Sequence, residues 1–343
     1  MQVKGVRFHL AVALSALLAA CSASISPEDS RWLGFPGGDG PGAGKKVVFV
    51  AGDEEYRSEE ALPMLARLMS EHHGFECVVL FSQDPETGEI DPDNSSNIPG
   101  LHLIEDADLL VLQLRFRELP DADMAHLMKH VEKGKPLVGI RTTTHAFNYN
   151  ENLDSPFAKW SWRSQEPKGG FGQEILGETW VAHHGHHGQE ATRGVPREAN
   201  ANHPTLRGVE DVFGPTDVYA IRDLPKDAIV LLDGAVLGGM SPDSPILDDP
   251  KNNPMHPVAW LRLRPLPGGG AQRIFATTMG AATDWSSEDL RRLFLNASLW
   301  ALGKEAEIPE GGLRATMIGS WNPTPFGFGN FQRGLRPRDA SEH

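Results

Sequence analysis

The stretch KPLVGIRTTTHAF, residues 135–147, decides the fold of this chain. Its apolar run, residues 136–140, lies between a helix-ending Gly134 and a polar cluster, which is typical of a buried strand that ends in a tight turn. In open α/β sheets, ligands bind beyond the carboxyl ends of the strands. The stretch therefore places four polar side chains at a candidate binding edge: Arg141, Thr142, Thr143 and His145.

Strands and helices alternate on the N-terminal side of this stretch. Short apolar runs predict strands at residues 46–51, 75–81 and 108–114. Apolar residues at helical spacing predict two helices, one beginning between Ser58 and Pro63 and one near Asp121. This alternation is typical of a mainly parallel sheet with helices on both faces, so we predict a three-layer α/β fold.

The C-terminal side is less regular. It predicts strands at residues 189–198, 218–221, 228–232, 257–264 and 272–278. A Pro/Gly-rich turn at residues 267–270 predicts a hairpin between the last two strands, and Ser286 is the expected N-cap of a final helix.

The charge of the chain excludes one class of partner. Its 343 residues carry 46 acidic and 32 basic side chains, a formal net charge of −14. A nucleic-acid-binding protein needs a basic face to neutralise phosphates, so we expect no nucleic acid as partner. With 40% apolar and 23% charged residues, the composition is that of a soluble globular protein that handles small molecules.

The N-terminus predicts a targeting segment. Lys4 and Arg7 precede an apolar run, residues 10–20, that is too short to span a bilayer comfortably. The run ends in LAAC, residues 18–21, which resembles the lipobox of bacterial lipoproteins. We expect residues 1–21 to be a lipoprotein signal peptide with Cys21 as lipidation site, and residues 22–44 to be a linker. The protein would then be exported and lipid-anchored at a bacterial membrane, facing the periplasm or the cell exterior; the alternative is an ordinary secretory signal with a chance cysteine.

Three loops follow predicted parallel strands at the same edge of the sheet: residues 52–57, 115–117 and 141–145. A glutamate beside a histidine can serve as an acid–base pair, which makes three residues candidates for catalysis: Glu54, Glu55 and His145. Arginines supply directional donors to sugar hydroxyls or carbonyls. The predicted substrate-binding residues are Tyr56, Arg57, Arg115, Arg117, Arg141, Thr142 and Thr143. In the alternative, these residues cap helices and pair with one another.

The segment HHGHH, residues 183–187, predicts a metal site because imidazole is the commonest metal ligand. Its candidate ligands are His183, His184, His186 and His187. In an extended chain the outer pair and the inner pair point to opposite sides. A catalytic zinc usually has three protein ligands, so a carboxylate has to complete a site for Zn²⁺ or a similar divalent ion; the candidates are Glu54, Glu55 and Glu190. The alternative is a polar loop whose histidines contact substrate or solvent.

Several ordered segments resemble the ThuA-like, or trehalose-utilisation, family. They are residues 139–147, 177–187, 202–204, 207–209, 256–260 and 276–300. The resemblance covers residues 45–303 and implies a flavodoxin-like fold similar to class I glutamine amidotransferases, with residues 304–343 as a C-terminal extension. The head GDEEYRSEE, residues 52–60, is similar to an exported, lipoprotein-bearing branch of the family. Relatives imply a role in the catabolism of sugars, particularly keto-disaccharides.

The elbow departs from the amidotransferase pattern. That pattern requires Gly-x-Cys-x-Gly, whereas Arg141 stands in the place of the cysteine and Thr143 in the place of the second glycine. Independently of the resemblance, a threonine hydroxyl inside a chain is a poor nucleophile without a dedicated base. We therefore expect non-covalent acid–base chemistry on a carbohydrate, with or without a metal. The alternative is a non-catalytic carbohydrate-binding lipoprotein with a degenerate amidotransferase site.

Overall fold

The computed structural model describes residues 1–2 and 31–342. Residues 3–21 of the predicted signal peptide, with Cys21, and residues 22–30 of the predicted linker lie outside the described residues. Within the described range, no helix combines the length and the apolar character needed to cross a membrane.

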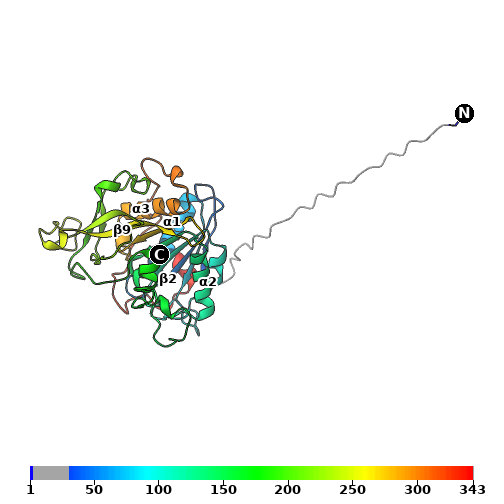
Figure 1. The fold of residues 1–343 in the computed structure, drawn as a ribbon, viewed down its shortest axis with the longest axis horizontal. Coiled ribbons are helices and arrows are strands. Elements are labelled where there is room, and N and C mark those ends of the chain that lie inside the picture. Colours follow the sequence, from blue (N-terminus) through cyan, green and yellow to red (C-terminus); the bar gives the residue numbers. More distant parts are fainter. Residues whose placement is uncertain (3–30, 343) are drawn as a thin grey trace.

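One mixed sheet of ten strands forms the centre of the molecule (Figure 1). Its strands lie side by side in the order β1 (Leu33–Phe35), β3 (Glu76–Phe81), β2 (Lys46–Gly52), β4 (Leu109–Leu114), β5 (Leu137–Ile140), β10 (Ala271–Thr277), β9 (His256–Pro265), β8 (Ala228–Val236), β6 (Thr192–Pro196) and β7 (Val212–Gly214). The strands β2, β3, β4 and β5 each fall within one residue of the predicted bounds.

Helices cover both faces of the sheet, as predicted. Helices α1 (Ser58–His73) and α3 (Glu288–Ala301) pack with Val47 and Phe49 of β2 on one face. On the other face, α2 (Asp121–Glu132) and the short 3₁₀ helix Leu101–Asp106 pack with Val48 and Val50. Successive strand residues point to opposite faces, so the unbroken apolar run of β2 serves both cores. The three-layer α/β class is confirmed.

The sheet has a parallel half and an antiparallel half. From β3 to β10, neighbouring strands are parallel. Beyond β10, every pairing is antiparallel, as is that of β1 with β3. Helical crossovers join β2 to β3, β3 to β4 and β4 to β5, whereas the predicted hairpin at residues 267–270 joins β9 to β10 directly. Three carboxyl-terminal strand ends, those of β2, β4 and β5, therefore lie at one edge.

One predicted strand is wrong. Residues 218–221 do not join the sheet and form a single bridge, between Tyr219 and His183. Their backbone instead supports the histidine-rich segment, because the carbonyl of Val218 accepts from the N–H groups of His184 and Gly185. The edge position is taken by β7, which the apolar pattern did not indicate.

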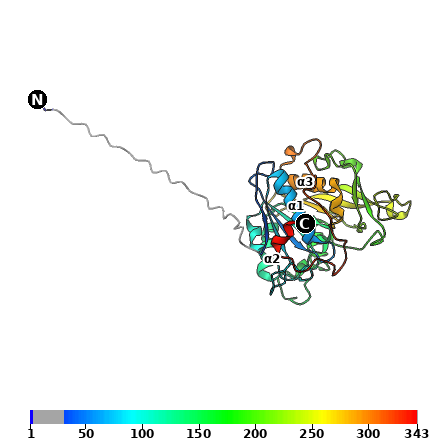
Figure 2. The same cartoon turned by 180° about the vertical axis from the view of Figure 1, so that it is seen from behind.

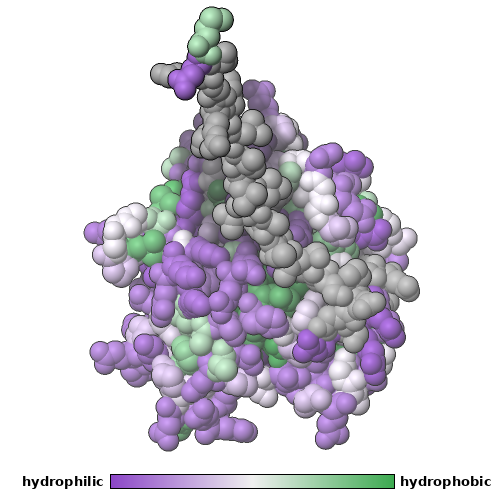
Figure 3. Space-filling model, turned by 90° about the vertical axis from the view of Figure 1, so that its right-hand side faces the viewer, coloured by the Kyte–Doolittle hydropathy of each residue, from purple (hydrophilic) through white to green (hydrophobic). Residues whose placement is uncertain are grey.

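Both flanking segments pack onto the domain. Strand β1 lies within the predicted linker and pairs with β3, so ordered structure begins upstream of Lys45. The C-terminal tail, residues 304–342, returns to α1, as the position of the chain end beside this helix indicates (Figure 2). It is fastened there by Glu60, whose carboxylate accepts from the N–H and hydroxyl of Thr324. Figure 3 shows a largely hydrophilic surface on the face it draws, outside the part covered by grey atoms.

Candidate functional site

The three predicted loops meet at one edge of the sheet, and each contains one strained residue. Arg57, Phe116 and Arg141 have φ values of 60°, 52° and 42°, and they are the non-glycine residues with positive φ in the described part of the chain. Such left-handed conformations cost free energy in L-residues and cluster at functional sites. Their coincidence in the loops after β2, β4 and β5 marks this edge as the candidate site.

Asp53 joins the first loop to the elbow. One of its carboxylate oxygens accepts from the backbone N–H groups of Glu55 and Tyr56, at 2.9 and 3.2 Å. The other accepts from the hydroxyl of Thr142 at 2.6 Å. This buried carboxylate therefore fixes the backbone that presents Glu54 and Glu55.

The two predicted catalytic glutamates differ in their contacts. Glu54 is ion-paired with Arg115 and with Nη2 of Arg117, the latter at 2.8 Å. Glu55 lies 3.3 Å from Nε of Arg115 and 3.6 Å from Nε2 of His187. Burial raises the pKa of Glu55, and the positive charge of Arg115 opposes this shift only in part. Glu54 is thus held by two arginines, whereas Glu55 faces the histidine-rich segment.

Several predicted binding residues are turned inward. Arg57 donates to the carbonyl of Gly327 at 2.6 Å, and Arg117 donates to the carbonyls of Pro92 and Asn94 at 2.9 and 2.7 Å. The hydroxyl of Thr143 donates to backbone carbonyls 2.7 Å away. These side chains and that of Thr142 are buried and saturated by the protein, so they support the loops rather than face a ligand. Among the predicted binding arginines, Arg115 has a partly exposed side chain.

Arg141 fills the elbow from within. Its guanidinium lies between the rings of Tyr56 and Tyr219, 4.1 and 4.4 Å from their centroids. One nitrogen donates to the carbonyl of Thr278 at 2.6 Å, and another lies 3.4 Å from a carboxylate oxygen of Asp217. Arg141 is fully buried and contacts Asp217 from the inner side, and its predicted role in substrate binding stays a prediction.

The outer histidines of residues 183–187 converge on Asp217. Nδ1 of His183 lies 2.7 Å from one carboxylate oxygen, and Nδ1 of His187 lies 2.9 Å from the other. Although burial alone raises the pKa of the Asp217 carboxyl, hydrogen bonds from both histidines and the charge of Arg141 hold it well below its usual range. The same hydrogen bond to Asp217 raises the pKa of His187. We call His183, His187 and Asp217 the His–Asp cluster.

The inner histidines lie elsewhere. Nε2 of His184 is 2.7 Å from the carbonyl of Lys251, and its ring centroid lies 4.1 Å from that of His256, with the two rings tilted by 55°. His186 is exposed and contacts Glu190 through its backbone N–H. Glu190 in turn pairs with Lys251 at 2.8 Å. The outer and inner pairs are separated as predicted, although the segment bends at residues 184–185 and turns at 187–189 instead of being extended, and only the outer pair reaches the site.

Aromatic rings surround His145. Its ring centroid lies 5.0 Å from Phe116, 5.6 Å from Trp180 and 6.4 Å from Trp162. Burial lowers the pKa of His145 well below its usual range, and the charges of Arg115 and Arg141 add to this effect. His145 is consequently a neutral imidazole behind an aromatic wall, and its predicted catalytic role stays a prediction.

The C-terminal tail also contributes to this edge of the sheet. We call the edge formed by the loops after β2, β4 and β5, together with the His–Asp cluster, the rim. The ring of Phe326 lies 5.6 Å from Tyr56 and 5.2 Å from His187, and Phe328 lies 5.0 Å from the guanidinium of Arg115. Sequence reasoning missed this contribution and missed Asp217. The sequence does contain a signal for Asp217, because this residue directly precedes the apolar residues 218–221. The carboxylates predicted to complete a metal site were all glutamates, however.

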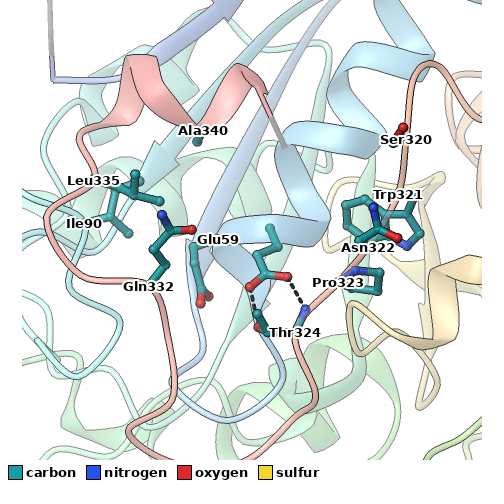
Figure 4. A pocket seen from close by; sticks show the side chains of 11 residues that line it. Glu59, Ile90, Ser320, Trp321, Asn322, Pro323, Thr324, Gln332, Leu335 and Ala340 are labelled. Atoms are coloured by element: carbon teal, nitrogen blue, oxygen red, sulfur yellow. Dashed lines mark hydrogen bonds between the residues drawn. The ribbon is translucent and has the colours of Figure 1, made fainter.

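A separate pocket of about 210 Å³ lies between α1 and the tail (Figure 4). Its lining includes Glu59, Trp321, Thr324 and Gln332 and shares no residue with the His–Asp cluster. The carboxylate of Glu59 is buried there without a hydrogen-bond partner among the described residues. We therefore treat this pocket as a feature of tail packing and not as part of the rim site.

Comparison with family models matches the chain to one family, and structure comparison lists further similar proteins. A family model named ThuA and described as trehalose utilisation matches residues 46–301. A ThuA-like protein from Parabacteroides merdae ATCC 43184 is 14% identical, with a TM-score of 0.49 over 80% of this chain and 96% of that one. A ThuA-like protein from Bacteroides uniformis ATCC 8492 is also 14% identical, with a TM-score of 0.48 over 78% and 95%. No curated protein matches the chain.

Proposed function

The chain belongs to the ThuA family, described as trehalose utilisation, and from this premise we propose that it acts on a keto-sugar or disaccharide in carbohydrate catabolism. The reaction is non-covalent acid–base chemistry at the rim formed by the loops after β2, β4 and β5. The placement of Glu55 carries this proposal.

Glu55 is suited to move a proton at the rim. Its carboxylate lies 3.3 Å from Nε of Arg115 and 3.6 Å from Nε2 of His187, whose side chain is 36% exposed. A carboxylate between two cationic or polar donors, next to solvent, can take a proton from a hydroxyl or from a carbon beside a carbonyl. Glu54 forms ion pairs with both Arg115 and Arg117, so Glu55 is the better candidate for the acid–base group.

The surroundings of Glu55 suit a sugar. Arg115 offers guanidinium donors from a partly exposed position. The partly exposed rings of Phe116, Trp162 and Trp180 form a wall on which a pyranose ring can stack. At the elbow, Arg141 stands where covalent catalysis needs a nucleophile, so acyl transfer is not part of the proposal.

We also propose that the protein is exported and held at a bacterial membrane by a lipid on Cys21. The charged start, the apolar residues 10–20 and the LAAC motif support this localisation. Fatty-acid labelling that leaves Cys21 unmodified in cells would contradict it.

The test uses the full chain with keto and unoxidised disaccharides, and mass spectrometry detects the products. Glu55→Gln should lower kcat by about 100-fold or more, the usual contribution of a general acid–base group, and leave sugar binding in place. Glu71→Gln, on the exposed surface of α1 and away from the rim, is the matched control and should leave turnover unchanged. Wild-type turnover by Glu55→Gln would overturn the assignment. Sugar binding without product, at any metal concentration, would identify a non-catalytic carbohydrate-binding protein instead.

A further inference from the structure

We propose that the His–Asp cluster binds one divalent transition-metal ion. Its ligands are Nδ1 of His183, Nδ1 of His187 and the carboxylate of Asp217. The ligand atoms of the three residues lie within 4.8 Å of one another. Metal binding itself is independent of the sugar, whereas the role of the ion in the reaction rests on the proposed function.

The spacing of the donors suits an ion. Zinc binds imidazole nitrogen at about 2.0–2.1 Å and carboxylate oxygen at about 2.0–2.2 Å. Donor atoms around one ion therefore lie roughly 3–4 Å apart. The present Nδ1–oxygen distances of 2.7 and 2.9 Å are slightly shorter, so the two partly exposed imidazoles have to turn outward a little to admit an ion. The hydrogen bonds now joining both imidazoles to Asp217 hold the same atoms together that the ion would hold.

The supporting contacts fix the cluster from behind. Asp217 is fully buried and its carboxylate lies 3.4 Å from Nη2 of Arg141, which is itself held by the carbonyl of Thr278. The histidine-rich segment is held by two backbone N–H donors to the carbonyl of Val218, the residue after Asp217. Partners that orient ligand side chains in this way are a regular feature of metal sites. A loose surface pair of histidines would lack them.

The cluster is buried on one side and open on the other. Asp217 is fully buried, whereas the side chains of both histidines are 36% exposed. Three protein ligands with an open side is the arrangement of catalytic zinc sites. The cluster adjoins the loops of the rim, because Nε2 of His187, the ring nitrogen that would not bind the ion, lies 3.6 Å from Glu55. An ion held there supplies a Lewis acid to the carbonyl or hydroxyl oxygens of a bound keto-sugar.

The donor set also selects the kind of ion. Two imidazoles and one carboxylate suit Zn²⁺ and neighbouring first-row ions, whereas Ca²⁺ and Mg²⁺ prefer an all-oxygen set. We expect chelator-treated protein to bind Zn²⁺ with a stoichiometry of one and to bind Mg²⁺ far more weakly, as measured by calorimetry and elemental analysis of the full chain.

The chain offers a matched control within one loop. His183→Ala and His187→Ala should each weaken Zn²⁺ binding by at least tenfold, and the double variant should abolish it. His184→Ala and His186→Ala remove identical side chains from the same five residues and should leave affinity within twofold. Circular dichroism and thermal melts verify that each variant is folded, and both target histidines are exposed enough for folding to survive.

The outcomes separate this inference from the proposed function. Absence of stoichiometric Zn²⁺ binding, or equal losses in all four single variants, would overturn the metal site. Sugar turnover that survives complete metal removal would overturn the role of the ion and leave the proposed function standing. Stoichiometric binding that depends on His183 and His187, without any sugar turnover, would support the metal site and count against the proposed function.

Discussion

Arg141 combines a strained backbone with a side chain that turns into the protein. The backbone is left-handed at this position, with φ of 42°, directly after β5. In elbows that carry a nucleophile, such strain exposes the side chain. Here the guanidinium is buried between two tyrosines and lies beside Asp217. The strained backbone therefore places the guanidinium of Arg141 on the buried side of the His–Asp cluster.

The first prediction concerns the buried pair of Arg141 and Asp217. Arg141→Met should lower the free energy of unfolding by about 3–5 kcal/mol, because it removes the buried cation that opposes the Asp217 carboxylate and leaves this buried charge only its hydrogen bonds to two partly exposed histidines. Urea denaturation measures the change. Arg67→Met, which removes an exposed helix-surface pair with Glu71, is the control and should cost less than about 1 kcal/mol. Equal costs for the two variants would show that the Asp217 contact contributes no more than a surface pair.

At this scale the sequence predicts where polar residues gather but not which way they turn. The three loops after β2, β4 and β5 meet as expected. Yet the guanidinium of Arg57 donates a hydrogen bond to the carbonyl of Gly327, a residue far away in the chain. Local sequence patterns carry no information on such a distant partner. A polar side chain that bonds to the protein's own backbone therefore looks the same in the sequence as one that is open to a ligand.

Secondary structure was predictable where the apolar pattern is local and strong. The strands of the parallel half and helices α1 and α2 lie where the sequence indicates. The cap of α3 differs by one residue, because Ser286 belongs to a preceding 3₁₀ turn and the hydroxyl of Ser287 accepts from the N–H of Leu290. Residues 218–221 failed as a strand because their backbone bonds to the histidine-rich segment, a long-range contact.

The second prediction tests the joint where α1 ends. Gly74 has φ of 77°, and its N–H donates to the carbonyls of Met69 and Ser70. An added Cβ would lie 2.6 Å from the carbonyl oxygens of Gly38 and Asp39, so the segment that follows β1 would have to move.

Gly74→Ala should therefore cost about 2–4 kcal/mol in the free energy of unfolding, because backbone strain and a steric clash act together. Gly88→Ala is matched in conformation, with φ of 70°, but has open space around the new methyl group and should cost about 1–2 kcal/mol. Thermal denaturation of both variants gives the comparison. A Gly74→Ala cost no larger than that of Gly88→Ala would mean that the upstream segment does not pack against the helix end.

At the scale of the whole molecule, three distant parts build one rim. The parallel half of the sheet contributes the loops with Glu55, Arg115 and Arg141. The segment around β6 and β7 contributes the His–Asp cluster, and the C-terminal tail contributes Phe326 and Phe328. The first part follows from the rule that parallel strands end at a common edge. The other two depend on long-range packing, which explains why the sequence alone did not identify Asp217 or the tail.

The last prediction uses the tail, which returns to α1 and covers Glu59 (Figure 4). Burial raises the pKa of Glu59 to about 8, with the charge of Glu60 adding to the shift and that of Arg57 opposing it. In the unfolded chain the group has an ordinary pKa near 4.5. Between these values the folded protein holds a proton that the unfolded chain has lost, so the stability due to this group falls as pH rises, by at most about 1.4 kcal/mol per unit.

Glu59→Gln removes this proton-linked loss while keeping the size of the side chain. The variant should therefore gain stability relative to the wild type as pH rises from 5 to 8, and the difference should level off above the folded pKa. Urea denaturation across this range measures it, and subtraction cancels the titration of all other groups. A flat difference for Glu59→Gln would mean that Glu59 titrates as a solvated carboxyl and that the tail does not cover it, because burial is the largest cause of its raised pKa.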